Sequence, residues 1–201
     1  MDENPRYKAE SLFRQGIEYE EVKDWDHDIA SYIEALQHDG RLMSAYIRLG
    51  HIYIIQEDHD NALVTFNKAI QRDPKYARTY QSRAAIYLGR NDYEKALDDA
   101  NTLIRLEPDQ GFNYEMRGNI HQHFGKYELA IADYGEAIGL GGNLDFIYMS
   151  RGNAYENMGD YANAIADFEL FLISDTAQRL GDLIGLQDRI SNLKQLTSLN
   201  S

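Results

Sequence analysis

The chain has 201 residues, no cysteine and a formal net charge of −13 at pH 7. The lack of cysteine excludes a disulfide framework, a thiol nucleophile and a thiolate metal site. The acidic balance argues against a nucleic-acid partner, because binding a phosphate backbone needs a basic surface.

Residues 1–8 form a polar N-terminal extension without an apolar signal region. No window of the chain approaches the roughly 18 apolar residues that a membrane-spanning helix needs. We therefore expect no membrane span and a soluble protein in the cytoplasm. The negative charge either keeps an open surface soluble or attracts a basic partner, and the first interpretation is favoured.

From residue 9 onward, one pattern returns every 34 residues. In each copy, apolar residues three and four positions apart form two segments with a short break between them, which predicts a pair of amphipathic helices. The first segments share a column of small residues: Gly16, Gly50, Ala84, Gly118 and Gly152. The second segments share a column of mostly large residues: Tyr32, Phe66, Ala100, Tyr134 and Phe168.

These columns resemble the tetratricopeptide repeat, in five tandem copies over 9–42, 43–76, 77–110, 111–144 and 145–178. The resemblance implies an all-α fold, a right-handed α-α superhelix of five helical hairpins. In this family the first helices line a concave groove that holds a peptide or a helix of a partner. Because unrelated proteins share the repeat, it says little about the particular function.

Repeat one departs most from the pattern. Asp28 stands where the other copies have alanine, and Trp25 stands where later copies have tyrosine. We expect Trp25 to pack in the hairpin, with a partner contact as the alternative. The acidic run at 24–28 superficially resembles a calcium loop but lacks its glycine and closing glutamate, so a metal site is rejected.

Repeats two and three are the most regular, and we expect them to be the stiffest part of the chain. Asp92 should cap the second helix of repeat three, and a large residue at Ala84 should overpack the hairpin. The adjacent carboxylates Asp98 and Asp99 are interpreted as a solvated surface.

The end of repeat four carries three glycines in the stretch 139–143. Glycine gives the backbone unusual freedom, so we expect a flexible joint between repeats four and five. A dinucleotide loop is rejected because the third glycine and a preceding strand are missing. Beyond repeat five, residues 179–201 are predicted to form a capping helix and tail, with a dimer or partner contact as the less favoured role.

No catalytic or phosphate-binding motif occurs in the chain. His121 and His123 are two residues apart on one helix, so they cannot share a metal, and His121 is interpreted as a core residue. We therefore expect a protein that is not an enzyme and needs no cofactor.

The resemblance to the repeat family assigns groove positions in every copy. The candidate ligand-binding residues are Arg48, His51, Arg78, Gln81, Phe112, Met116, Asn119, His123, Phe146, Met149, Ser150 and Asn153. Phe112, Met116, Phe146 and Met149 either face the groove as apolar anchors or are buried between repeats, and the sequence leaves both possibilities open. The amides could bind a peptide backbone and the arginines a carboxylate.

The leading hypothesis is a non-enzymatic scaffold or adaptor that binds a peptide segment or partner helix in the groove. The lysine and asparagine set of chaperone-binding family members is missing, so that role is not predicted. The alternative is a structural protein that self-associates, as a weak homo-oligomer, through the terminal repeat or the C-terminal helix.

Overall fold

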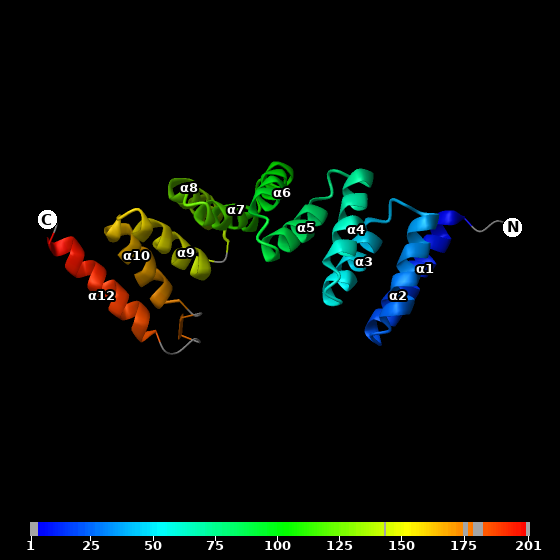
Figure 1. Ribbon diagram of the computed structural model, residues 1–201, viewed down its shortest axis with the longest axis horizontal. Coiled ribbons are helices and arrows are strands. Elements are labelled where there is room, and N and C mark those ends of the chain that lie inside the picture. Colours follow the sequence, from blue (N-terminus) through cyan, green and yellow to red (C-terminus); the bar gives the residue numbers. More distant parts are fainter. Residues whose placement is uncertain (1–3, 143, 175–176, 179–182, 200–201) are drawn as a thin grey trace. The chain divides into compact units, whose positions relative to one another are not determined.

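The computed structural model describes residues 4–142, 144–174, 177–178 and 183–199. Within these ranges all the elements of regular secondary structure are helices (Figure 1), which confirms the all-α prediction. They are α1 (Pro5–Glu21), α2 (Trp25–His38), α3 (Met43–Ile55), α4 (His59–Arg72), α5 (Ala77–Gly89), α6 (Tyr93–Leu106), α7 (Gly111–His123), α8 (Tyr127–Gly139), α9 (Leu144–Asn157), α10 (Tyr161–Leu172) and α12 (Ile184–Leu199).

Helices α1 to α10 form five successive pairs, each closed by a short turn. The turn contains a residue with a positive φ angle, which is Gly125 in the fourth pair and Gly159 in the fifth. Aspartates cap several of the second helices. Asp58 accepts the backbone N–H of Asn61, and Asp92 accepts that of Lys95 at 3.4 Å, as predicted.

The two sequence columns fit together as pairs of side chains within each hairpin. A Cβ atom added to Gly50 would lie 2.4 Å from the ring of Phe66, and one added to Gly118 would lie 2.8 Å from Tyr134. The aromatic ring of the second helix therefore needs glycine opposite it. Repeat three solves the same packing problem with two buried alanines, Ala84 and Ala100.

Repeat one contains a buried carboxyl group. Asp28 is fully buried, and neither of its carboxylate oxygens has a hydrogen-bond partner among the described residues. Burial raises its pKa to about 6, with smaller contributions from the acidic neighbours Glu20, Asp24 and Asp26. Trp25 packs against the Tyr32 cluster, which agrees with the hairpin interpretation of this residue.

The chain divides into two compact units, residues 1–106 and 107–201. Both sides of the glycine-rich junction after α8 belong to the second unit. Gly142 is held closely there, because its N–H donates to the Ala137 carbonyl at 2.8 Å and an added Cβ would lie 2.9 Å from that oxygen. Asn143 lies outside the described residues. The flexible joint stays a prediction, and close packing is a second reason for glycine at this position.

In the second unit, α12 packs on α10. Ile190 and Leu193 are buried there with Ala164 and Phe168, and Arg189 lies over the Phe168 ring at 4.7 Å. Not every apolar residue of this C-terminal segment is buried. Ile184 is 63% exposed, while Leu180 lies outside the described residues.

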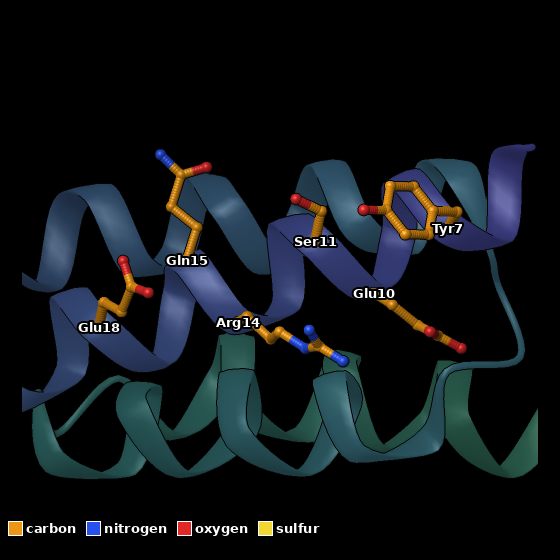
Figure 2. Close-up of a pocket in the computed structure, with 6 residues that line it drawn as sticks. All are labelled: Tyr7, Glu10, Ser11, Arg14, Gln15 and Glu18. Carbon is orange, nitrogen blue, oxygen red and sulfur yellow. The ribbon is translucent and has the colours of Figure 1, made fainter. Parts of the chain in front are cut away.

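At the other end of the sequence, α1 has a polar outer face. α3 packs on α2 through Ala45, Leu49 and Ile52, but the positions 34 residues earlier on α1 are Ser11, Gln15 and Glu18. Figure 2 shows these side chains with their neighbours along one face of α1: Tyr7, Glu10, Ser11, Arg14, Gln15 and Glu18. Such a face is compatible with water and does not need an apolar helix to cover it.

Candidate functional site

In the first unit, the candidate groove residues line a hollow of about 280 Å³. We call it the arginine hollow, and it is lined by Phe13, Glu20, Ser44, Ile47, Arg48, His51, Tyr76 and Arg78. α1, α3 and the start of α5 supply most of these residues. Thus Arg48, His51 and Arg78, which the sequence assigned to three groove positions, come together around one cavity.

A short ion pair fixes one side of the arginine hollow. Arg48 Nη1 lies 2.5 Å from Glu20 Oε2, and the buried hydroxyl of Tyr32 donates to the same oxygen at 3.0 Å. The guanidinium group of Arg48 also lies over the Phe13 ring, 5.9 Å from its centroid. These contacts hold Arg48 in position and neutralise much of its charge, so it is less available to a ligand than the sequence suggests.

His51 and Arg78 form the rest of the polar wall. His51 Nε2 lies 3.1 Å from Ser82 Oγ. Burial, and then the charge of Arg78, lowers the pKa of His51, so that its ring is neutral at pH 7. Arg78 is exposed and forms no ion pair with an acidic side chain within the described ranges. Gln81, three residues later on α5, is also exposed. Arg78 therefore supplies the accessible positive charge of the hollow.

In the second unit, the four apolar candidates separate into two kinds. Phe112 on α7 is 48% exposed and Phe146 on α9 is 51% exposed, whereas Met116 is buried. Met149 is partly buried and packs against the cluster of Ala164 and Phe168. The structure thus places Met116 and Met149 toward the core and leaves the two phenylalanines accessible.

A buried tyrosine connects the polar candidates of α7 and α9. The Tyr134 hydroxyl donates to Asn119 Oδ1 at 2.7 Å, and Gln122 Oε1 lies 3.0 Å from it. Ser150 on α9 lies near this hydroxyl, and burial raises the Tyr134 pKa well above its usual range. With its oxygen engaged, Asn119 has its amide N–H groups left to offer to a ligand.

Asn119 and Asn153 occupy equivalent positions but have different surroundings. The residue corresponding to Tyr134 in the next repeat is Phe168, which has no hydroxyl group. Asn153 is therefore not held by the same hydrogen bond. His123, at the end of α7, is exposed, and its ring contacts that of Phe124 with 5.7 Å between the centroids.

The structure also shows a feature that was not predicted from the sequence. In repeats three to five, an arginine of the first helix makes a two-pronged ion pair with an aspartate of the second, 16 residues later. The pairs are Arg83–Asp99, Arg117–Asp133 and Arg151–Asp167, with distances of 2.6 to 2.9 Å. The 34-residue spacing of both residue types could have revealed these pairs.

These pairs correct the interpretation of Asp99 as part of a solvated surface. Its side chain is only 2% exposed, and both of its oxygens accept from Arg83. Arg83 also lies over the rings of Tyr80 and Tyr87, at 5.6 and 5.7 Å. A buried pair of this kind is costly to break on one side, so its role here is structural.

His121 is largely buried, as expected for a core residue. Its side chain is 12% exposed, and Nε2 lies 3.7 Å from Asp133 Oδ2. Across the described ranges, no group of three or more His, Asp or Glu side chains could hold a metal ion. No helix in those ranges is both long and apolar enough to cross a membrane.

Comparison with known proteins gives a family match over nearly the whole chain. Residues 4–195 match the family model described as the ETO1 C-terminal domain. A search of curated protein sequences gave no match.

Solved structures with the same fold are tetratricopeptide proteins. The MamA protein aligns with a TM-score of 0.75 and 21% identity, over 88% of this chain and 96% of its own. A tetratricopeptide repeat protein from Parabacteroides merdae ATCC 43184 aligns with a TM-score of 0.76 and 19% identity, over 96% of this chain and 74% of its own. YrrB, described as a TPR protein with an unusual peptide-binding site, aligns with a TM-score of 0.69 and 15% identity, over 80% and 83%. These similarities establish a tetratricopeptide solenoid fold.

Proposed function

Because the chain belongs to the ETO1 C-terminal domain family and has the tetratricopeptide fold, we propose that it is a scaffold that binds a segment of a partner protein. The proposed binding surface is formed by the first helices of the repeats. The fold supports this class of function because solenoids of this kind present extended surfaces to other chains. YrrB, which shares the fold, is described as having a peptide-binding site.

The observation that carries the proposal is the exposure of Phe112 and Phe146. The two residues are 34 positions apart and occupy equivalent places near the starts of α7 and α9. About half of each ring is accessible, although large aromatic side chains are usually buried. Aromatic rings are frequent anchors in protein interfaces because they bury much apolar area with little loss of conformational entropy.

Polar groups lie on the same helical faces as the two rings. Asn119 is seven residues after Phe112, and Ser150 is four residues after Phe146, so each pair shares a face. Asn119 is held by its hydrogen bond from the Tyr134 hydroxyl. A segment anchored by the phenylalanines would find the Asn119 amide in a fixed orientation, with Asn153 and His123 as further polar contacts.

The first unit contributes a contact of another kind. Arg78, with Arg48, His51 and Gln81 near it, would bind a carboxylate of a partner segment. Since Arg48 is paired with Glu20, Arg78 is the residue that makes the direct contact. Met116 and Met149 are packed toward the core, so they would support the surface that carries Phe112 and Phe146 and would not contact the partner directly.

Replacing Phe112 and Phe146 together by alanine tests the proposal. A partner is first identified by affinity capture with the wild-type protein, and its binding is then measured by calorimetry. The double variant should bind at least roughly 30-fold more weakly, which corresponds to about 2 kcal/mol for the loss of two aromatic anchors. Its thermal stability should hardly change, since both rings are half exposed.

A matched control uses two exposed leucines on the second helices of the same unit, Leu129 on α8 and Leu170 on α10. Their replacement by alanine removes similar exposed apolar area away from the proposed surface. Equal binding by both double variants, or an unchanged affinity of the phenylalanine variant with an intact fold, would contradict the proposal.

A further inference from the structure

Repeat two lacks the arginine–aspartate pair of the later repeats. Leu49 stands 34 residues before Arg83, and Thr65 stands 34 residues before Asp99. In repeat three, Arg83 also binds Asn67 on α4 at 2.6 Å, and the position corresponding to Asn67 is Ile33 on α2. A chain of three polar side chains is thus replaced by Ile33, Leu49 and Thr65.

A hollow of about 260 Å³ opens where these three residues meet. It is lined by Ile33, Leu36, Gln37, Tyr46, Leu49, Thr65 and Lys68, from α2, α3 and α4. The Thr65 hydroxyl donates to the Asn61 carbonyl of its own helix at 2.8 Å, so its hydrogen-bonding need is met there. The Leu49 side chain is shorter than the arginine that stands at its position in repeats three to five.

The rim of this hollow is basic, although the whole chain is acidic. Lys68 and Tyr46 also line an adjoining open depression of about 530 Å³, together with Gln71 and Arg72. No acidic side chain of the described residues forms an ion pair with Lys68 or Arg72, and both are exposed. An apolar pocket with two unpaired cations at its edge favours an apolar group that has a carboxylate beside it.

We propose that this hollow on α2, α3 and α4, which we call the leucine hollow, binds an apolar side chain of an acidic partner segment. Its volume lies below the roughly 300–1,000 Å³ typical of sites for drug-sized ligands, which favours a single side chain over a whole small molecule. Glutamate or aspartate residues next to that side chain would pair with Lys68 and Arg72. This site is on other residues than the proposed phenylalanine surface and does not depend on it.

The site can be tested with three short peptides and the full chain. The probes are acetyl-Glu-Leu-Glu-amide, acetyl-Glu-Ala-Glu-amide and acetyl-Lys-Leu-Lys-amide, titrated against the isotope-labelled protein with detection by NMR. The first should shift the amide signals of Leu49 and Thr65 in a saturable way. The alanine and lysine peptides should each bind at least roughly tenfold more weakly, because one loses apolar burial and the other reverses the charge.

The variant Leu49→Arg/Thr65→Asp installs the pair that three other repeats contain, so it should fold and fill the hollow. It should abolish the shifts caused by the Glu-Leu-Glu peptide. A second variant, Lys68→Glu/Arg72→Glu, changes only exposed side chains and should reverse the preference in favour of the Lys-Leu-Lys peptide. This second variant decides the matter if the first one does not fold.

Three results would overturn the proposal. One is binding that persists in the filled variant, and another is equal affinity for the three peptides. The third is binding of octanoate at Leu49 and Thr65 with no binding of any peptide, which would assign the hollow to small amphiphilic anions. The Phe112→Ala/Phe146→Ala variant should bind the Glu-Leu-Glu peptide as the wild type does, so the two binding surfaces can fail separately.

Discussion

Replacing Asp28 by alanine should stabilise the first unit at neutral pH. Asp28 is fully buried without a hydrogen-bond partner among the described residues, and alanine occupies this position in the other four repeats. Burial disfavours its charged form, and the pKa rises from 3.8 to about 6. In the unfolded chain this carboxylate is hydrated, so its ionisation carries no desolvation penalty.

The pKa sets both the size and the direction of the effect. A rise from 3.8 to about 6 on folding corresponds to roughly 3 kcal/mol, which is an upper limit. The folded protein holds the proton more tightly, so the stability due to the neutral carboxyl is complete below pH 3.8. It is lost as the pH rises through about 6. Asp28→Ala should therefore gain about 2–3 kcal/mol at pH 7.5 and little at pH 4.

Trp25 provides the assay, because it is the only tryptophan and lies in the same helix, α2. Urea unfolding followed by its fluorescence at several pH values reports on the first repeat. Asp28→Asn is the matched control, since it keeps the shape and polarity of the side chain but cannot ionise. Equal or lower stability of Asp28→Ala at pH 7.5, or the full wild-type pH dependence in Asp28→Asn, would refute the reasoning.

Three further predictions concern packing, protonation and ion pairing. Ala100→Phe should lower the free energy of unfolding by about 1–3 kcal/mol through overpacking. Adding Ala84→Gly makes room for the ring and should restore most of the lost stability. A double-mutant cycle that shows no coupling between the two positions would contradict this prediction. Burial lowers the pKa of His121, so its contribution to stability is present above pH 6.5 and is lost as the pH falls. His121→Tyr should therefore reduce the fall of the thermal midpoint between pH 7 and pH 5. A fall as large as that of the wild type would count against this reasoning. Arg151→Leu should lower the free energy of unfolding in urea by about 3 kcal/mol, because it leaves Asp167 buried without its partner. Arg151→Leu combined with Asp167→Thr, which copies repeat two, should lower it much less. Equal losses in the two variants would show that the pair is not coupled.

The candidate site was only partly predictable from the sequence. Phe112 and Met116 are four residues apart on one helix and are both apolar, so the periodicity treated them alike. The structure exposes the first and buries the second. Their difference arises from how neighbouring helices cover α7, and the spacing of residues within one helix does not specify this.

Charged residues show the same limit. Asp98 and Asp99 are adjacent and acidic, and composition alone assigns both to the surface. Because successive side chains of a helix point in different directions, Asp99 faces Arg83, 16 residues earlier, and the Asp99 side chain is buried. A periodic column of arginines and aspartates is visible in the sequence, but only the hairpin geometry shows that the two columns meet.

The sequence by itself determined the helical pairs, their 34-residue period and the matching of glycine with an aromatic ring, or of alanine with alanine, within each pair. These features follow from local periodicity and from steric fit within one hairpin. Only the tertiary structure decided which apolar side chains stay exposed, which charges are buried in pairs and where hollows remain. Those outcomes depend on how the two helices of a hairpin face each other and on how neighbouring hairpins pack, where a single side chain such as Leu49 either fills a space or leaves it open.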